Sequence, residues 1–93
     1  LLVITAEECG ELTQACSKIL RHGIDNGLRK KLLEEVGDLQ CMIDLLIEHD
    51  VLKPTDIEDR KFVKRDKLKK YSNLWKTQAQ SISNPAQKDN NHH

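Results

Sequence analysis

The sequence has few aromatic residues, little glycine or proline, and no long apolar run. These shortages argue against a β-sheet protein and against a membrane-spanning one. Its aromatic residues are Phe62, Tyr71 and Trp75, in a chain of 93 residues with 4 glycines and 2 prolines. Leucine, isoleucine, lysine and glutamate are abundant instead, which favours helices over a β-sheet. No stretch of about 18 apolar residues is present, so the sequence predicts no helix that spans a membrane.

Cysteine occurs only as Cys9, Cys16 and Cys41, and no two of them form a CxxC pair. An odd number without that spacing argues against a disulfide framework and against a zinc site. Unpaired cysteine behaves as a small apolar side chain and stays reduced in the cytosol. We therefore expect three reduced thiols packed in the core of a cytoplasmic protein.

Positive and negative charges balance over the whole chain, with 15 of each sign, but they are not spread evenly. Residues 1–53 carry ten acidic and six basic side chains, whereas residues 54–93 carry five acidic and nine basic ones. An acidic part and a basic part could together bind a metal ion with a phosphate chain, the acids holding the metal and the bases the phosphates. A nucleic-acid surface is disfavoured, because Asp59 and Asp66 dilute the basic segment and no aromatic residues interleave its lysines.

Two helices are expected in the first half of the chain. The first covers residues 1–22 and ends at Gly23, which can adopt the left-handed conformation that terminates a helix. Asp25 or Asn26 caps the second helix, which runs from residue 28 to about residue 49. Apolar residues spaced by four and three along the second helix form a packing seam. The members of this seam are Leu32, Val36, Leu39, Ile43 and Leu46.

A third helix is expected over residues 56–75. Proline interrupts the chain before it, Thr55 serves as its N-cap, and Glu58 completes a capping box. Residues 77–93 are polar and lack periodicity, which predicts a disordered tail after a single domain of residues 1–76. Such a small domain has a marginal core, so we expect oligomerisation.

One carboxylate of the first helix, that of Glu8, lies where a core would place leucine. Each residue advances about 100° around the helix axis. On that measure the apolar residues within about 40° of Glu8 are Leu1, Ile4, Leu12, Ala15 and Ile19. Glu11 lies about 60° to one side. Burial of an ionised carboxylate without a partner is costly, so a compensating cation is expected.

The second helix repeats this arrangement. Glu35 lies about 60° from the seam and Asp38 about 120° from it, whereas Glu34 points away and is expected in solvent. Each helix thus offers two carboxylates at positions i and i+3, and packing of the two helices would bring all four together. One such pair alone would be ordinary surface charge, but its repetition favours a metal site. Oxygen ligands without His or Cys suit Mg²⁺, with Mn²⁺ as a substitute, and Mg²⁺ commonly shares its ligand shell with substrate phosphates.

The stretch Glu8-Cys-Gly-Glu11, followed after a helix and a turn by Glu35-Val-Gly-Asp38, resembles the paired ExxE and ExxD motif of the all-α nucleoside triphosphate pyrophosphohydrolases. This superfamily includes the MazG proteins, the dimeric dUTPases, the dCTP pyrophosphatases and phosphoribosyl-ATP pyrophosphohydrolase. The segments EECGELTQACSKILRHG, LLEEVGDLQCMI and KRDKLKKYSNLW are similar to those of short, single-motif MazG-like proteins of bacteria and phages. The resemblance covers about residues 1–75.

The resemblance implies an all-α antiparallel helical bundle, whose four-helix-bundle core is completed by oligomerisation as a homodimer or homotetramer. It implies that Glu8, Glu11, Glu35 and Asp38 bind Mg²⁺ and carry the catalysis. The family reaction is hydrolysis of a nucleoside triphosphate between the α and β phosphates, which gives a nucleoside monophosphate and pyrophosphate. Many relatives have a further helix before the first motif that helps to form the nucleobase pocket, so the resemblance leaves the base preference open.

Four lysines are candidates for binding the triphosphate. Lys18 follows Glu11 on one face of the first helix, where a salt bridge to the glutamates is the plain alternative. Lys61, Lys64 and Lys67 match basic residues that relatives place on the third helix, although a row of lysines is usually a solvated face.

Two other functions stay open at this point. Phosphoribosyl-ATP pyrophosphohydrolase shares the architecture and the metal motif, and only its substrate separates it. A non-catalytic helical dimerisation module would carry the same acids as surface charge. In that case Glu8→Leu and Glu35→Leu would leave stability unchanged or raise it even with Mg²⁺ present.

Overall fold

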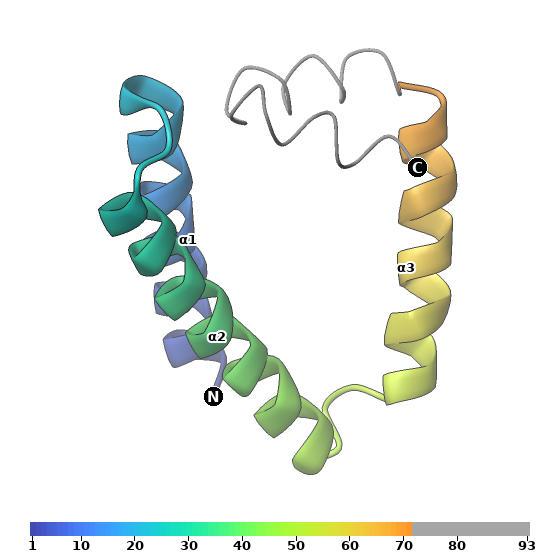
Figure 1. Ribbon diagram of the computed structural model, residues 1–93. Helices are drawn as coiled ribbons and strands as arrows, with labels where there is room; N and C mark the ends of the chain where they lie inside the picture. Colours follow the sequence, from blue (N-terminus) through green and yellow to red (C-terminus); the bar gives the residue numbers. More distant parts are fainter. Residues whose placement is uncertain (72–93) are drawn as a thin grey trace.

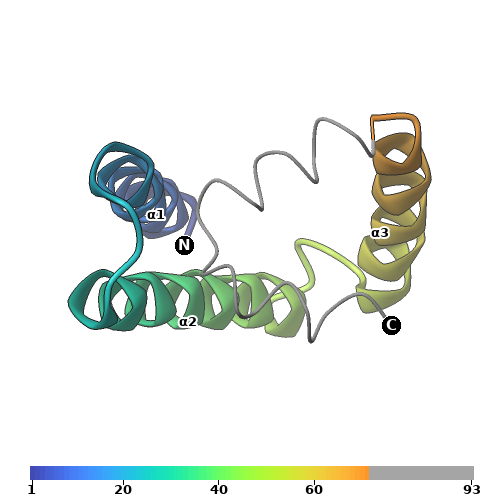
Figure 2. The same cartoon turned by 45° about the horizontal axis from the view of Figure 1, so that its top comes forward.

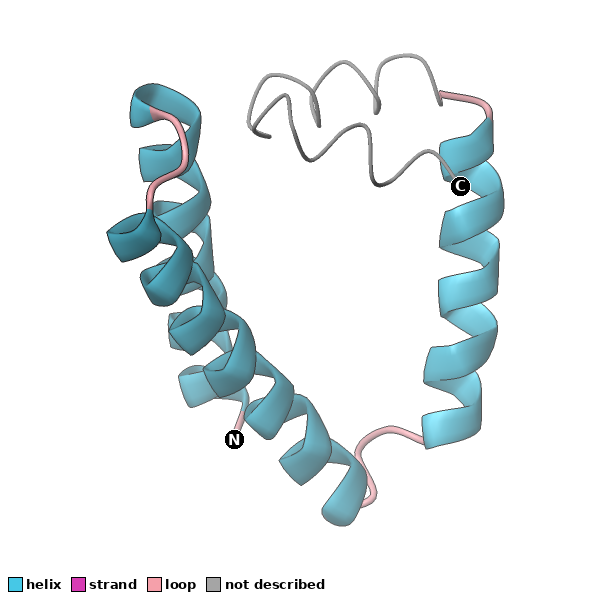
Figure 3. Cartoon of the chain, in the orientation of Figure 1, coloured by secondary structure: helices cyan, strands magenta, loops and turns pink. Residues whose placement is uncertain are grey.

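The computed structural model describes residues 1–71, which form three α-helices and no β-strand (Figures 1 and 3). The helices are α1 (Leu2–His22), α2 (Asn26–Glu48) and α3 (Pro54–Lys69). The all-α prediction is therefore confirmed for this part of the chain. The predicted end of the domain at residue 76 and the predicted tail 77–93 lie outside the described residues.

A short turn joins α1 to α2 and sets the two helices antiparallel and side by side (Figures 1 and 2). Gly23 ends α1 with φ 78° and ψ 171°, and its N–H donates to the carbonyl of Ile19 at 2.8 Å. The positive φ is as predicted, but the extended ψ differs from the left-handed helical conformation, and this combination is open almost only to glycine. Asp25 caps α2 as predicted, because its Oδ1 accepts a hydrogen bond from the backbone N–H of Leu28 at 2.7 Å.

The core between α1 and α2 is small. Its buried apolar residues are Ala15 and Ile19 from α1, and Met42 and Leu46 from α2. Of the five residues in the predicted seam only Leu46 is buried, and the other four are half-buried. The contact face of α2 is thus rotated from the seam toward Met42. Two helices can bury only one stripe of each other, and the partner decides which stripe it is.

The three cysteines lie outside this stripe. Cys9, Cys16 and Cys41 are free thiols, as expected, but all three are exposed. The prediction that they pack in the core is therefore wrong for a single chain. On α1 both cysteines fall about 80–100° from Glu8 around the helix axis, at the edge of the face that α2 covers.

The third helix begins at Pro54, two residues earlier than predicted, and ends at Lys69, with residues 70 and 71 in a turn. Its N-cap is Lys53, with no capping hydrogen bond from a side chain, so the predicted Thr55 cap and capping box are wrong. Proline suits the first helical position because its φ is already helical and it has no N–H to satisfy. Residues 72–75, the rest of the predicted helix, lie outside the described residues.

Figures 1 and 2 show α3 leaving the end of α2 and standing apart from α1. None of the residues of α3 is buried. Within residues 1–71, α3 therefore lacks the packed face that usually stabilises a helix, and a helix of this length without one is marginal in water. Among residues 1–71, no helix is both long enough and apolar enough to cross a membrane.

Candidate metal centre

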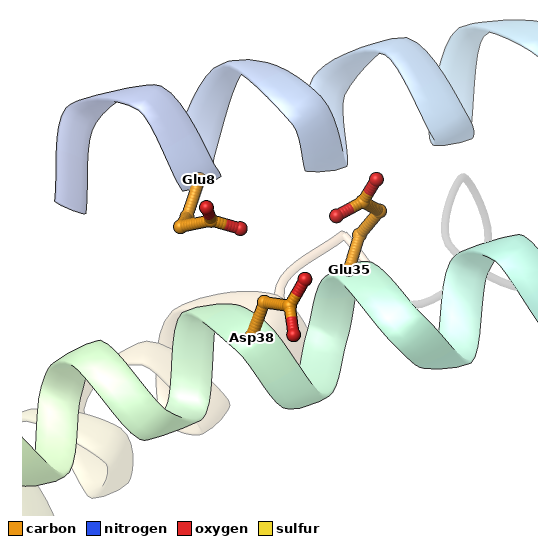
Figure 4. A group of neighbouring side chains, drawn as sticks. All are labelled: Glu8, Glu35 and Asp38. Carbon is orange, nitrogen blue, oxygen red and sulfur yellow. The ribbon is translucent and has the colours of Figure 1, made fainter. Parts of the chain in front are cut away.

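Three of the four predicted carboxylates gather between α1 and α2. Glu8 extends from α1, and Glu35 and Asp38 extend from successive turns of α2 toward it (Figure 4). One carboxylate oxygen of each residue lies within 4.8 Å of the other two. The antiparallel turn brings residue 8 opposite the middle of α2, and the i, i+3 spacing places Glu35 and Asp38 on one side of that helix.

These three carboxylates differ in their access to water. Glu35 is buried, with 4% of its surface exposed, whereas Glu8 is half-buried and Asp38 is exposed. The Oε2 atom of Glu8 is buried and has no hydrogen-bond partner. A buried polar atom without a partner is costly, and an ionised one more so. The atom therefore lacks the cation or hydrogen-bond donor that its environment calls for.

The electrostatics of Glu8 agree with this geometry. Desolvation raises the pKa of Glu8 above its usual value, and the negative charges of Asp38, Glu35, Glu11 and Glu7 raise it further, in that order. Like charges placed this close disfavour full ionisation of the cluster unless a cation joins them. The cluster is thus arranged to attract positive charge.

One cation already lies at the edge of the cluster, and sequence reasoning missed it. Lys31 Nζ lies 3.0 Å from Oε2 of Glu35, one turn earlier on α2. The pKa of Lys31 is raised by its hydrogen bond to Glu35 and then by the charge of that carboxylate. The i, i+4 spacing could have indicated this pair, but only the burial of Glu35 separates it from an ordinary surface salt bridge.

Glu11, the fourth predicted ligand, lies on the exposed side of α1 and outside the three-residue group. It is near enough to add to the negative potential at Glu8. Lys18 is also exposed, and within residues 1–71 it makes no ion pair with Glu11 or Glu7. The salt bridge that was the alternative for Lys18 is therefore not formed within residues 1–71. As predicted, Glu34 is exposed.

The lysines of α3 are not brought to the carboxylates within one chain. Lys61 pairs with Glu58 at 2.6 Å, and both line a groove of about 330 Å³ between α2 and α3. Lys64 and Lys67 are exposed along the same helix, which stands apart from α1 in both views (Figures 1 and 2). Their predicted contact with a triphosphate stays a prediction.

The donor set fits a hard divalent cation. Mg²⁺ binds oxygen at about 2.0–2.1 Å, so oxygens at adjacent octahedral positions lie about 3 Å apart. The three oxygens lie within 4.8 Å of one another, so the side chains would have to move closer together to hold one ion. Glu8 Oε2 would then gain the partner that it lacks. The ligands that would hold the ion are Glu8, Glu35 and Asp38.

Comparisons of the chain with protein-family models, with curated proteins and with solved structures return no match. The likeness to the nucleoside triphosphate pyrophosphohydrolases accordingly rests on the residues of the two motifs and their flanks.

Proposed function

We propose that this protein is a Mg²⁺-dependent nucleoside triphosphate pyrophosphohydrolase. The observation that carries the proposal is the convergence of Glu8, Glu35 and Asp38, with the buried Glu8 Oε2 left without a partner. A cluster of surface acids held by chance would keep its oxygens in water, whereas in this cluster Glu35 is buried and Glu8 is half-buried. The two motifs supply the reaction class, which is the hydrolysis of a nucleoside triphosphate to a monophosphate and pyrophosphate.

In the proposed reaction water adds across the α–β phosphoanhydride, and the bond from the α phosphorus to the bridging oxygen breaks. When bound, the metal ion would neutralise phosphate oxygens and make a coordinated water more acidic. Glu8, Glu35 and Asp38 supply the oxygens that hold the ion. Glu11, exposed beside Glu8, is available to orient the attacking water or accept its proton. Lys18 is available on the same helix for the departing pyrophosphate.

A second copy of the chain belongs to the proposal. The N-cap and the first turn of α1 expose four apolar side chains, namely Leu1, Leu2, Val3 and Ile4. Four exposed apolar side chains at one end of a helix favour a contact with another chain. Two helical hairpins packed about a two-fold axis would form a four-helix bundle and cover that surface. In this proposed dimer, α3 of one chain would carry Lys61, Lys64 and Lys67 toward the carboxylates of the other. Size-exclusion chromatography with light scattering tests for a homodimer or homotetramer.

The activity is tested by measuring pyrophosphate release from ribo- and deoxynucleoside triphosphates, with and without Mg²⁺. Wild type is compared with Glu35→Gln, and Glu34→Gln serves as the matched control because Glu34 is the exposed neighbour on the same helix. We expect release that needs the metal, is lost in Glu35→Gln and is kept in Glu34→Gln. Phosphoribosyl-ATP is included in the panel, and release from it alone would favour the phosphoribosyl-ATP pyrophosphohydrolase function.

The non-catalytic alternative makes a different prediction. If the acids are only surface charge, Mg²⁺ will not raise the unfolding midpoint of wild type, and Glu8→Leu will leave the protein equally stable or more stable at every metal concentration. If they form the proposed site, Mg²⁺ will stabilise wild type and will have little effect on Glu8→Leu. Thermal unfolding with a Mg²⁺ series distinguishes the two.

A further inference from the structure

The ion pair between Lys31 and Glu35 is the strongest feature that the proposed reaction does not use. It joins a side chain with 49% of its surface exposed to one with 5% exposed, across 3.0 Å. The order of the two residues is the weaker one for a helical pair, since glutamate is better placed N-terminal to lysine. Helix stability alone therefore gives little reason for the pair.

Its location suggests another reason. Glu35 is the buried member of the carboxylate cluster. Among residues 1–71, Lys31 is the only basic residue that forms an ion pair with one of the three acids. Three ionised carboxylates carry three negative charges, and a divalent cation leaves one of them unbalanced. The ammonium of Lys31 supplies the missing charge, but it also lies where it repels an incoming cation.

We propose that Lys31 is the built-in counter-ion of Glu35, which stabilises the metal-free fold and weakens the binding of free divalent cations at the carboxylate cluster. This inference rests on the proposed metal site. Without metal, the Lys31 ammonium keeps the buried Glu35 carboxylate from being an isolated charge. With metal, that stabilisation is partly redundant, because the ion itself neutralises Glu35.

The test compares Lys31→Met, which keeps an apolar stem and removes the charge, with Lys31→Arg, which keeps the charge. Lys30→Met is the control, since Lys30 is an exposed neighbour that makes no ion pair within residues 1–71. Thermal unfolding is measured in EDTA and in saturating Mg²⁺, and Mn²⁺ affinity is measured directly by paramagnetic resonance without nucleotide.

We expect Lys31→Met to lower the unfolding midpoint in EDTA, to regain most of that loss in Mg²⁺, and to bind Mn²⁺ more tightly, on the order of tenfold. Lys31→Arg and Lys30→Met should behave like wild type. An equal loss in EDTA and in Mg²⁺, or weaker Mn²⁺ binding by Lys31→Met, would overturn the proposal. No loss in either condition would do the same, because the pair would then be an ordinary surface contact.

Failure of the proposed function gives a different result. If wild type itself gains no stability from Mg²⁺ and binds no Mn²⁺, the metal site is absent, and the effect on metal affinity proposed for Lys31 falls with it. The comparison in EDTA still decides whether Lys31 neutralises Glu35, because that comparison needs no metal.

Discussion

Glu8 on α1 and Asp38 on α2 face each other across the helix interface (Figure 4). A carboxylate oxygen of Glu8 lies within 4.8 Å of a carboxylate oxygen of Asp38. Neither residue is paired with a basic side chain among residues 1–71. Two acids held together in this way destabilise the fold unless a proton or a metal ion lies between them. The relationship therefore links stability to both metal and pH.

Replacement of Glu8 by glutamine is expected to stabilise the metal-free protein and to remove most of its response to Mg²⁺. Glutamine keeps the shape of the side chain, removes the desolvated charge and offers a hydrogen-bond donor to Asp38. Unfolding midpoints of both proteins in EDTA and in Mg²⁺ check this. Lower stability of Glu8→Gln in EDTA would mean that Glu8 already has a favourable partner that the single chain does not contain.

The raised pKa of Glu8 predicts how metal-free stability changes with pH. Because the folded protein holds this proton more tightly than the unfolded chain, the contribution of Glu8 is fully present below the unfolded pKa. It is lost as pH rises through the folded pKa. Urea unfolding in EDTA between about pH 4 and pH 7 should therefore show wild type losing stability relative to Glu8→Gln as pH rises. A constant difference between the two would contradict the raised pKa.

The features that could be predicted from the sequence are those set by local chemistry. The Asp25 cap and the positive φ at Gly23 depend on residues adjacent in the chain, and together they fix a tight antiparallel turn. Once the turn is fixed, the helical period places Glu8 on the apolar face of α1, and the i, i+3 spacing places Glu35 and Asp38 on one side of α2. The sequence pattern could therefore identify these three residues as candidate ligands without the tertiary structure.

The features that were missed depend on how each helix is rotated about its axis. The packing seam of α2 predicted a face centred between Leu39 and Ile43, but α1 packs nearer Glu35 and Met42. Periodicity identifies an apolar stripe, whereas the contact partner selects which edge of it is buried. The same rotation of α2 buries Glu35, and this burial makes its pair with Lys31 more than a surface contact.

Because the core is small, truncation of two adjacent residues of α1 is expected to change the free energy of unfolding by very different amounts. Ile19 is 4% exposed and Leu20 is 70% exposed. Ile19→Ala should lower the free energy of unfolding by about 2–5 kcal/mol, and Leu20→Ala should change it by less than about 0.5 kcal/mol. Denaturant unfolding measures both. A loss of similar size in Leu20→Ala would indicate that another surface, such as a second copy of the chain, covers Leu20.

Alanine is expected to stabilise the helices at the two glycines inside the carboxylate motifs. Gly10 and Gly37 lie within α1 and α2, and a Cβ added at either position would meet no atom within 4 Å. Neither has a positive φ. Since glycine within a helix costs about 0.5–1 kcal/mol relative to alanine, Gly10→Ala and Gly37→Ala should each stabilise the chain by about that amount. Unfolding is measured at several protein concentrations. A variant that loses stability, and loses more of it at high concentration, would indicate that a neighbouring chain approaches the helix closely at that glycine.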